Sequence, residues 1–310
     1  MKHFWLFLKG IAMGAADVVP GVSGGTIAFV TGIYTELLDS IKNINLQALK
    51  TLFKDGPRAF WQSINGTFLL VLGSGILLAL LSLARGIHYL LMNYPVWLWA
   101  FFFGLILASC WHIGKEIRRW GLAQLALLAL GAIIAGFIST ASPTSVTPTP
   151  LIILLAGSIA ICAMILPGIS GSFILVILGM YVPVLDAIRS LDLGILGIFA
   201  VGCLVGLLSV ARLITWAFHR YHDLVLALLT GFMVGALNKV WPWKETLSWR
   251  TNSAGQQVPL NEASVSPMGY AELTGDESQL LLAITCAFAG LLLVLLVEWV
   301  GRKKQPGAAR

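Results

Sequence analysis

Residues 20–41 read PGVSGGTIAFVTGIYTELLDSI, and closely related text returns at residues 167–188 as PGISGSFILVILGMYVPVLDAI. Aligned without gaps at a spacing of 147 positions, 10 of the 22 residues are identical. The matches include a Pro-Gly-x-Ser-Gly start, a central glycine and tyrosine, and a Leu-Asp pair near the end. Two unrelated apolar segments do not agree to this extent by chance, so the sequence contains an internal repeat.

The composition predicts an integral membrane protein. Of 310 residues, 58% are hydrophobic and 11% are charged, with a mean hydropathy of +0.87, whereas soluble domains carry about 25% charged residues. The net charge of +6 fits lysines and arginines in cytoplasmic loops better than nucleic-acid binding. The four cysteines stand singly in apolar runs without Cys-x-x-Cys spacing, so we expect no disulfide framework, no metal site and no cofactor.

A helix needs about 20 apolar residues to cross a bilayer. Six segments meet this length: 67–84, 95–113, 121–140, 194–212, 223–240 and 279–299. The two repeated regions differ, because in each a Pro-Gly-x-Ser-Gly break separates two apolar arms, the second of about 16 residues. Proline and glycine stop a helix, and broken backbone at membrane depth must be buried in protein or line a cavity. We therefore predict re-entrant helix hairpins at 4–41 and 151–188.

The distribution of basic residues tests this topology, since cytoplasmic loops are rich in lysine and arginine. With two re-entrant hairpins and both termini in the cytoplasm, 15 basic residues fall on the cytoplasmic side and five on the outer side. A single span through the first motif would move four of the 15 outside: Lys42, Lys50, Lys54 and Arg58. The charge bias therefore favours hairpins.

The repeat extends beyond the hairpins. Residues 75–85 (GILLALLSLAR) match residues 202–212 (GCLVGLLSVAR) at 7 of 11 positions with a spacing of 127. The spacing falls from 147 to 127 because the first half contains extra residues near 43–63, which have no counterpart in the second half. This stretch is amphipathic, and we expect it to lie at the cytoplasmic membrane surface. Three spans separate the motifs, so the halves face opposite ways, as in many transporters whose substrates bind where broken helices meet.

The predicted fold is thus an all-α polytopic membrane protein with an inverted-topology repeat. Each half, residues 1–141 and 142–310, contains one re-entrant helix hairpin and three transmembrane helices. The longest polar segment, 241–279, is expected to form an outer loop with a hairpin near residues 252–255.

The motifs suggest an anion site. Glycines allow close approach of the backbone to a ligand, and unpaired N–H groups at a helix start or in a tight turn attract anions. Two such turns entering from opposite faces would hold one phosphate or carboxylate. The alternative is that the glycines serve only close helix packing.

Two arginines and two tyrosines occupy equivalent positions in the halves. Arg85 and Arg212 end matching spans on opposite sides of the membrane. A guanidinium suits a phosphate, so each is a candidate gate that captures a headgroup on its own side, the alternative being contact with lipid phosphates. Tyr34 and Tyr181 are candidates to hydrogen-bond a headgroup or each other.

Asp17 lies inside the first hairpin, and its equivalent in the second is Met164. Carboxylates within a membrane are functional candidates, so Asp17 is either a proton carrier or a cap for the nearby backbone. Glu36 and Asp39, in the second arm, are further candidates for proton coupling. They and Asp186 lie nearer the membrane surface, where a solvated or capping carboxylate is the alternative.

MGAADVVPGVSGGTIAFVTGIY (residues 13–34) and LPGISGSFILVILGMY (residues 166–181) resemble the bacterial polyprenyl-phosphate (undecaprenyl-phosphate) translocase family. Such proteins are taken to return undecaprenyl phosphate, the lipid carrier of peptidoglycan and other envelope glycans, to the inner leaflet of the cytoplasmic (inner) membrane. The resemblance implies a flippase whose partners are this lipid and the bilayer. It places the headgroup at Ser23, Gly24, Gly25, Ser170, Gly171 and Ser172, and Thr26, next to Gly25, is a further substrate-binding candidate.

A second resemblance points to an enzyme. Membrane undecaprenyl-pyrophosphate phosphatases share inverted repeats and a PG-x-S-R-S-G motif whose arginine contacts phosphate. Gly24 and Gly171 stand at that arginine position here, and no glutamate-rich partner motif is found. Because hydrolysis would lack its electrophile and base, we expect a transporter. A transporter of a small soluble anion and a structural membrane partner remain as other classes.

Moving a phosphate inward against the membrane potential is costly. A phosphate monoester carries about −1.5 to −2 charges, and each costs about 2.3 kcal/mol per 100 mV. Two charges would oppose inward movement by about 4.6 kcal/mol, more than a thousandfold. We therefore expect proton co-transport with Asp17 as the carrier, and a polyprenyl tail that stays in lipid while the headgroup crosses between the hairpins.

Overall fold

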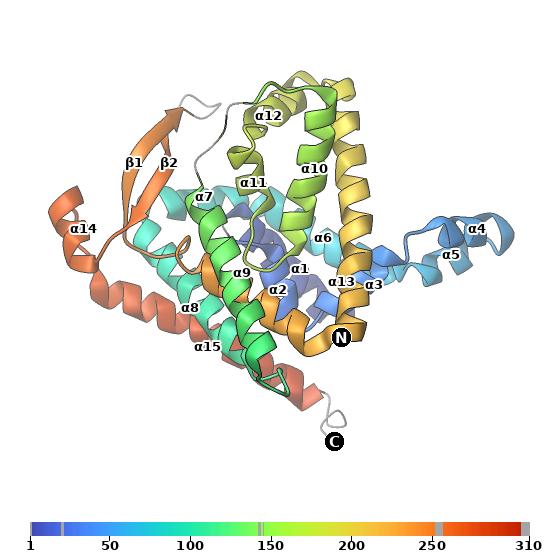
Figure 1. Ribbon diagram of the computed structural model, residues 1–310, viewed down its shortest axis with the longest axis horizontal. Coiled ribbons are helices and arrows are strands. Elements are labelled where there is room, and N and C mark those ends of the chain that lie inside the picture. The colour runs from blue at the N-terminus through green and yellow to red at the C-terminus, as the bar shows by residue number, and fades with distance from the viewer. Residues whose placement is uncertain (1, 20–21, 142–143, 145, 252–256, 305–310) are drawn as a thin grey trace.

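The computed structural model describes residues 2–19, 22–141, 144, 146–251 and 257–304 and is almost entirely helical (Figure 1). The first half contains α1 (Lys2–Val18), α2 (Gly24–Val30), α3 (Tyr34–Lys42), α4 (Leu46–Lys54), α5 (Pro57–Ser63), α6 (Gly66–Ser82), α7 (Ala84–Asn93), α8 (Pro95–Gly114) and α9 (Leu122–Thr140). The second half contains α10 (Pro150–Ile165), α11 (Gly171–Ile177), α12 (Tyr181–Ser190), α13 (Leu193–Ala236), β1 (Lys244–Thr251), β2 (Gln257–Ser264), α14 (Pro267–Thr274) and α15 (Leu280–Lys304).

Within these residues, four helices are long and apolar enough to cross a membrane: α8, α9, α13 and α15. The number rises to six if the bent pairs α5–α6 and α11–α12 each count as one span. The six predicted spans coincide with α6, α8, α9, the two parts of α13, and α15. The backbone of the 44-residue α13 leaves helical geometry at Tyr221 (φ −139°, ψ 50°), which separates its two predicted spans. The predicted all-α, multi-span class is therefore confirmed.

Each repeated region contains three helices rather than the two arms predicted from sequence. Helices of 17, 7 and 9 residues form the first region, and helices of 16, 7 and 10 residues form the second. The unpredicted break falls at Gly32 (φ 70°) and at its equivalent Gly179 (φ 69°), a conformation that glycine adopts readily. The second arms are therefore bent, by 108° between α11 and α12.

Identical hydrogen bonds close these breaks. The Ile33 N–H donates to the Ala28 carbonyl and the Gly32 N–H to the Phe29 carbonyl, at 3.0 and 3.1 Å. In the second half, Met180 donates to Leu175 and Gly179 to Val176, at 2.9 and 3.0 Å. This is the Schellman pattern of helix termination, and it satisfies carbonyl groups that a membrane interior would otherwise leave unpaired.

Glycines make matching helix contacts in the two halves. A β-carbon on Gly75 would collide with the Phe7 carbonyl where α6 packs on α1, and one on Gly202 would collide with the Leu154 carbonyl where α13 packs on α10. Gly202 is the sequence equivalent of Gly75. Small residues let helix backbones approach this closely, so Gly75 and Gly202 serve close helix packing.

Contacts between the halves also occur in equivalent pairs. Gly104 of α8 meets the Ala287 carbonyl of α15, and its equivalent Gly231 of α13 meets the Leu128 carbonyl of α9. Each half therefore packs its second span against the third span of the other half. The main core, which includes Val22 of the first hairpin, lies among these helices.

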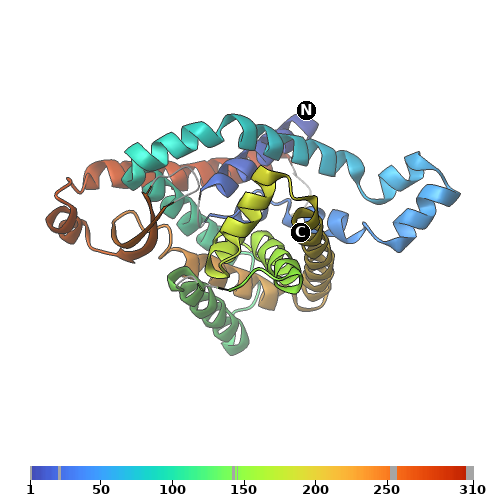
Figure 2. The same cartoon turned by 90° about the horizontal axis from the view of Figure 1, so that it is seen from above.

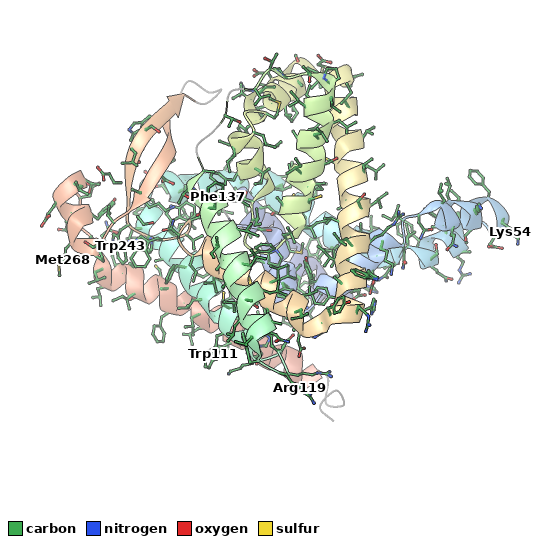
Figure 3. The ribbon with its side chains drawn as sticks, viewed as in Figure 1. Lys54, Trp111, Arg119, Phe137, Trp243 and Met268 are labelled. Atoms are coloured by element: carbon green, nitrogen blue, oxygen red, sulfur yellow. The ribbon has the colours of Figure 1, made fainter. Side chains whose placement is uncertain are left out.

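Two segments extend from this body. The segment predicted as amphipathic, 43–63, forms α4 and α5, which project as an arm seen in two views (Figures 1 and 2). Its Leu46 and Phe53 side chains are 77% and 82% exposed, and Lys54 lies near its tip (Figure 3). At the opposite end, β1 and β2 pair antiparallel within 241–279, as predicted, although the expected turn at 252–255 lies outside the described residues.

Candidate functional site

The two Pro-Gly-x-Ser-Gly breaks contact each other directly. The Ser23 hydroxyl at the α1–α2 break donates to the Met164 carbonyl at 2.9 Å. In the other direction, the Gly168 N–H at the α10–α11 break donates to the Thr26 hydroxyl at 2.9 Å. Ser23 and Thr26 are fully buried. Polar groups from opposite halves are therefore gathered in one place inside an apolar protein.

Asp17 caps the first break. Its carboxylate accepts a hydrogen bond from the Gly24 N–H at 2.7 Å, and the Gly25 N–H donates to the Ser23 hydroxyl at 3.1 Å. The amides predicted to bind an anion thus have partners within the chain. The capping role of Asp17 is observed, and its carboxylate occupies the position that an oxygen of a bound anion would take on Gly24.

The second break is different because its serine makes no cap. The Ser170 hydroxyl lies 3.0 Å from the Ser172 hydroxyl and accepts no hydrogen bond from the start of α11. Gly171 and Ser170 are buried, while Ser172 is exposed. Met164 replaces the acid here, so the two breaks offer unequal environments to one ligand.

A small cavity adjoins this second break. Its volume is about 10 Å³, roughly the space of one water molecule. Polar groups of its lining come from Gly168, Ser170, Ser139 at the end of α9, and Lys239 just after α13. Lys239 is one of the five basic residues on the predicted outer side, and a lone lysine at a span end belongs to no motif that would indicate a site.

The two equivalent tyrosines differ. Tyr34 is 2% exposed, packs against the Phe29 and Phe218 rings at 5.0 and 6.1 Å, and has a hydroxyl without a hydrogen-bond partner in the described structure. Tyr181 is half-buried. Because the Tyr34 hydroxyl has no partner, the two tyrosines do not hydrogen-bond to each other. Buried Thr215 also has an unpaired hydroxyl, and nothing in its local sequence would have revealed it.

The gate candidates also differ. Arg212 lines an open cavity of about 280 Å³ with Lys42, Asn45, Leu46 and Gln47. Arg85 is exposed in the first turn of α7. The structure therefore gives Arg212 a second cation and a cavity where α3 meets the arm.

The remaining acidic candidates lie on α3, away from the two breaks in sequence. Glu36 is exposed and accepts a hydrogen bond from the Asn65 amide at 3.2 Å, while Asp39 is half-buried. Lys9, which was not proposed for the site, donates to the Thr31 carbonyl at 2.6 Å. A cation there is favourable, because it meets the negative end of the α2 dipole.

Two lysines share one carboxylate beside β1 and β2. Glu262 Oε2 lies 3.3 Å from Lys239 Nζ and 3.6 Å from Lys244 Nζ. Burial lowers the pKa of Lys244 to about 8, although Glu262 opposes the shift. Burial would raise the pKa of Glu262, but the two lysines outweigh it and hold that pKa below its ordinary value.

Residues 13–258, which include both breaks, match the family described as undecaprenyl phosphate translocase-like. The chain belongs to this family. It is 50% identical over 303 residues to the polyprenyl-phosphate transporter of Vibrio cholerae serotype O1, covering 98% of each chain. It is 35% identical over 262 residues to the polyprenyl-phosphate transporter of Staphylococcus aureus, covering 78% of this chain and 88% of the relative. No solved structure matches the chain.

The family membership confirms the resemblance on which the sequence prediction depended. Both relatives are named as transporters, in agreement with the prediction that the protein is not an enzyme.

Proposed function

We propose that this protein is a proton-coupled flippase that returns a polyprenyl phosphate, undecaprenyl phosphate in the first instance, from the outer to the inner leaflet of the bacterial inner membrane for envelope glycan synthesis. The observation that carries the proposal is the direct contact between the two breaks through Ser23 and Gly168. It gathers hydroxyl and amide groups from both halves within one apolar core. A phosphate headgroup needs such groups to cross a membrane, whereas its tail does not.

The inverted repeat is part of this proposal. The paired glycine contacts support it, since equivalent positions make equivalent contacts. The spatial arrangement agrees with the sidedness inferred from charge: α12, β1, β2 and α14 lie toward the top and left of Figure 1, whereas the arm, the start of α1 and the end of α15 lie toward the right and bottom. The second group is the one assigned to the cytoplasm.

The headgroup binds where the breaks meet. Its oxygens accept hydrogen bonds from hydroxyls and amides of the substrate-binding set, which comprises Ser23, Gly24, Gly25, Thr26, Ser170, Gly171 and Ser172. Tyr34 and Tyr181, the first residues of α3 and α12, are further candidates. The tail stays in lipid, because the residues around the second break are largely apolar, as Ile138, Ile169 and Phe173 show.

Asp17 couples the movement to protons. Its carboxylate and a phosphate compete for the Gly24 N–H, which now donates to Asp17 at 2.7 Å. Protonation removes the charge of Asp17 and weakens this bond, since hydrogen bonds to charged groups are the stronger ones. The headgroup then gains the amide, and the co-transported proton offsets about 2.3 kcal/mol per 100 mV of the opposing potential. Glu36 and Asp39 on α3 pass the proton to the cytoplasm.

On the inner side, Arg212 and Lys42 bind the phosphate headgroup before it is released. Their shared cavity of about 280 Å³ has room for a phosphate, and its mouth is open. A guanidinium with a nearby ammonium favours an anion over neutral lipid. Arg85 has the corresponding role on the outer side.

The test is phosphate accessibility in proteoliposomes that contain radiolabelled undecaprenyl phosphate. An added phosphatase hydrolyses only the outer leaflet of protein-free vesicles, whereas the flippase should expose the whole pool, faster when the pH gradient drives protons in the direction of transport. A protected inner pool in the presence of folded protein would reject the function.

Two further measurements distinguish the rival functional classes. Uptake of radiolabelled inorganic phosphate at a similar rate would favour a soluble-anion transporter. Loss of lipid exchange when Ser23 and Ser170 are both replaced by alanine would exclude a purely structural role.

A further inference from the structure

Lys239, Lys244 and Glu262 form a largely buried charge cluster with an excess cation. Their side chains are 14%, 7% and 18% exposed, and both ammonium groups approach the same oxygen, Glu262 Oε2. A buried charge without full compensation is unfavourable. The cluster is therefore suited to receive a second anion.

Lys239 connects this cluster to the second break. It follows the end of α13 and lines the cavity that also contains Gly168, Ser170 and Ser139. Its ammonium lies 4.7 Å from the centre of the Phe173 ring, one position beyond Ser172. An ammonium group thus lies beside two hydroxyls and a glycine at the second break, on the side to which the basic-residue distribution assigns the 241–279 segment.

Glu262 holds the place of an anion in this arrangement. The cavity of about 10 Å³ that Lys239 lines admits roughly one water molecule, which is too little room for a phosphate. The Glu262 carboxylate already contacts the Lys239 ammonium at 3.3 Å. Glu262 belongs to β2, which lies outside the helical body (Figure 1). The Trp243 indole, which donates to the Ser278 carbonyl at 2.7 Å, ties the base of the hairpin to the body.

The position of Lys239 carries a charge pair in both halves. With the spacing of 127, its equivalent is His112 of α8. The His112 Nδ1 atom lies 3.1 Å from Glu298 of α15. A cationic or titratable side chain beside an acid therefore recurs at this place, which would not be expected if Lys239 served only the local stability of one loop.

We propose that Lys239, with Ser139 and Ser170, is the outer receiving site for a phosphate monoester, and that Glu262 is the tethered anion that the incoming phosphate displaces. This inference rests on the proposed lipid-phosphate transport and adds its first step. Exchange of one anion for another keeps an anion beside Lys239 while the headgroup enters.

The test compares binding of farnesyl monophosphate and inorganic phosphate to the purified full-length protein in detergent by calorimetry. Lys239→Gln should weaken farnesyl monophosphate binding by about tenfold or more, the effect of losing a hydrogen bond to a charged group. Lys239→Arg should restore most of it. The matched control is Lys115→Gln, since the Lys115 ammonium also lies 4.7 Å from an aromatic ring centre, that of Trp111, and this change should leave binding within about twofold.

Glu262→Gln should tighten farnesyl monophosphate binding, because it removes the competing charge, and added ligand should raise its melting temperature more than that of the wild type. Unchanged binding in Lys239→Gln, or weaker binding in a folded Glu262→Gln protein, would overturn the proposal. Equal affinity for inorganic phosphate would overturn the lipid headgroup as the ligand.

The phosphatase assay in proteoliposomes separates this inference from the function. Lipid exchange that persists at the wild-type rate in Lys239→Gln would reject the receiving site and leave the flippase standing. Lys239-dependent binding without any exchange by the wild type would support the site and reject the flippase.

Discussion

Asp17 combines two roles that the sequence presented as alternatives. Its carboxylate caps the Gly24 N–H at 2.7 Å, which is a structural contact. The same lone pairs must leave that amide when a phosphate binds, and protonation is the simplest way to weaken their hold. A cap that competes with the substrate is therefore a suitable coupling residue, and the observed geometry supports the proposal.

The first prediction concerns Asp17→Asn. The asparagine carbonyl can still accept from Gly24, so the fold should be retained, but the side chain no longer carries a proton. In the proteoliposome assay, lipid exchange by the variant should no longer respond to a pH gradient. Asp186→Asn, at an exposed carboxylate in the second hairpin, is the control and should keep the response. A gradient effect of wild-type size in Asp17→Asn would reject the assignment.

The second prediction concerns the pH dependence of the Glu262 cluster. Because the lysines lower the folded-state pKa of Glu262 below the ordinary value of 4.5, its stabilising contribution is present above pH 4.5 and disappears as the pH falls through the lowered pKa. Glu262→Gln should cost about 3 kcal/mol at pH 7, the lower end for breaking a buried ion pair.

Melting temperatures in detergent, followed by tryptophan fluorescence, should therefore differ most between wild type and Glu262→Gln near neutral pH and converge below pH 4.5. Glu272→Gln, on the exposed surface of α14, should match the wild type at both pH values. A difference that stays constant down to low pH would show that the carboxylate charge is not responsible.

At the scale of elements, glycine spacing decides which helices pair. Gly75 faces the Phe7 carbonyl across the α1–α6 contact, whereas nothing lies within 4 Å of the β-carbon position of Gly73 on the same helix. An added methyl group would therefore collide with backbone at Gly75 and meet open space at Gly73. The effect of alanine on stability at these two positions tests whether the close helix contact is present.

The third prediction follows from that contrast. Gly75→Ala should separate α1 from α6 and destabilise the protein by about 1–3 kcal/mol, as overpacking does. Gly73→Ala should be neutral or stabilise by about 0.5–1 kcal/mol, because alanine favours helix. Thermal unfolding of both variants in the same detergent provides the comparison. Equal melting temperatures would mean that the close crossing is not maintained in solution.

For the whole molecule, the inverted arrangement requires that the arm and the outer hairpin lie on opposite sides of the membrane. Lys54 lies near the tip of the arm, and Met268, which is 82% exposed, lies at the opposite end of the molecule on α14 (Figure 3). Both side chains are suitable for labelling from the aqueous phase.

The fourth prediction uses single cysteines at these positions. In intact cells, a membrane-impermeant maleimide should label Met268→Cys, and it should label Lys54→Cys only after the membrane is opened. The four natural cysteines are partly buried in apolar helices, and the unsubstituted protein gives their background. Labelling of both positions in intact cells would place them on one side and contradict the inverted repeat.

The sequence by itself determined the multi-span helical membrane class, the two breaks and the family. Each of these depends on local composition or on a repeated motif, and hydrophobic length and helix-breaking residues act within a few turns of chain. The break between α2 and α3 at Gly32 and the break between α11 and α12 at Gly179 were predictable in principle, since the glycines are identical in the two repeats. However, a glycine in an apolar run does not reveal the sign of its φ angle.

Only the tertiary structure decided which groups meet. Three contacts join elements that no local pattern connects: Ser23 with Met164, Asp17 with Gly24, and Lys239 with Ser170 at the same cavity. The unpaired hydroxyl of Thr215 also becomes apparent only in the folded structure. Such contacts depend on how whole helices cross, and the crossings are set by backbone approach at glycines more than a hundred residues apart in some cases. A lone lysine or threonine has no periodic signature, so its chemistry becomes visible only when its neighbours are in place.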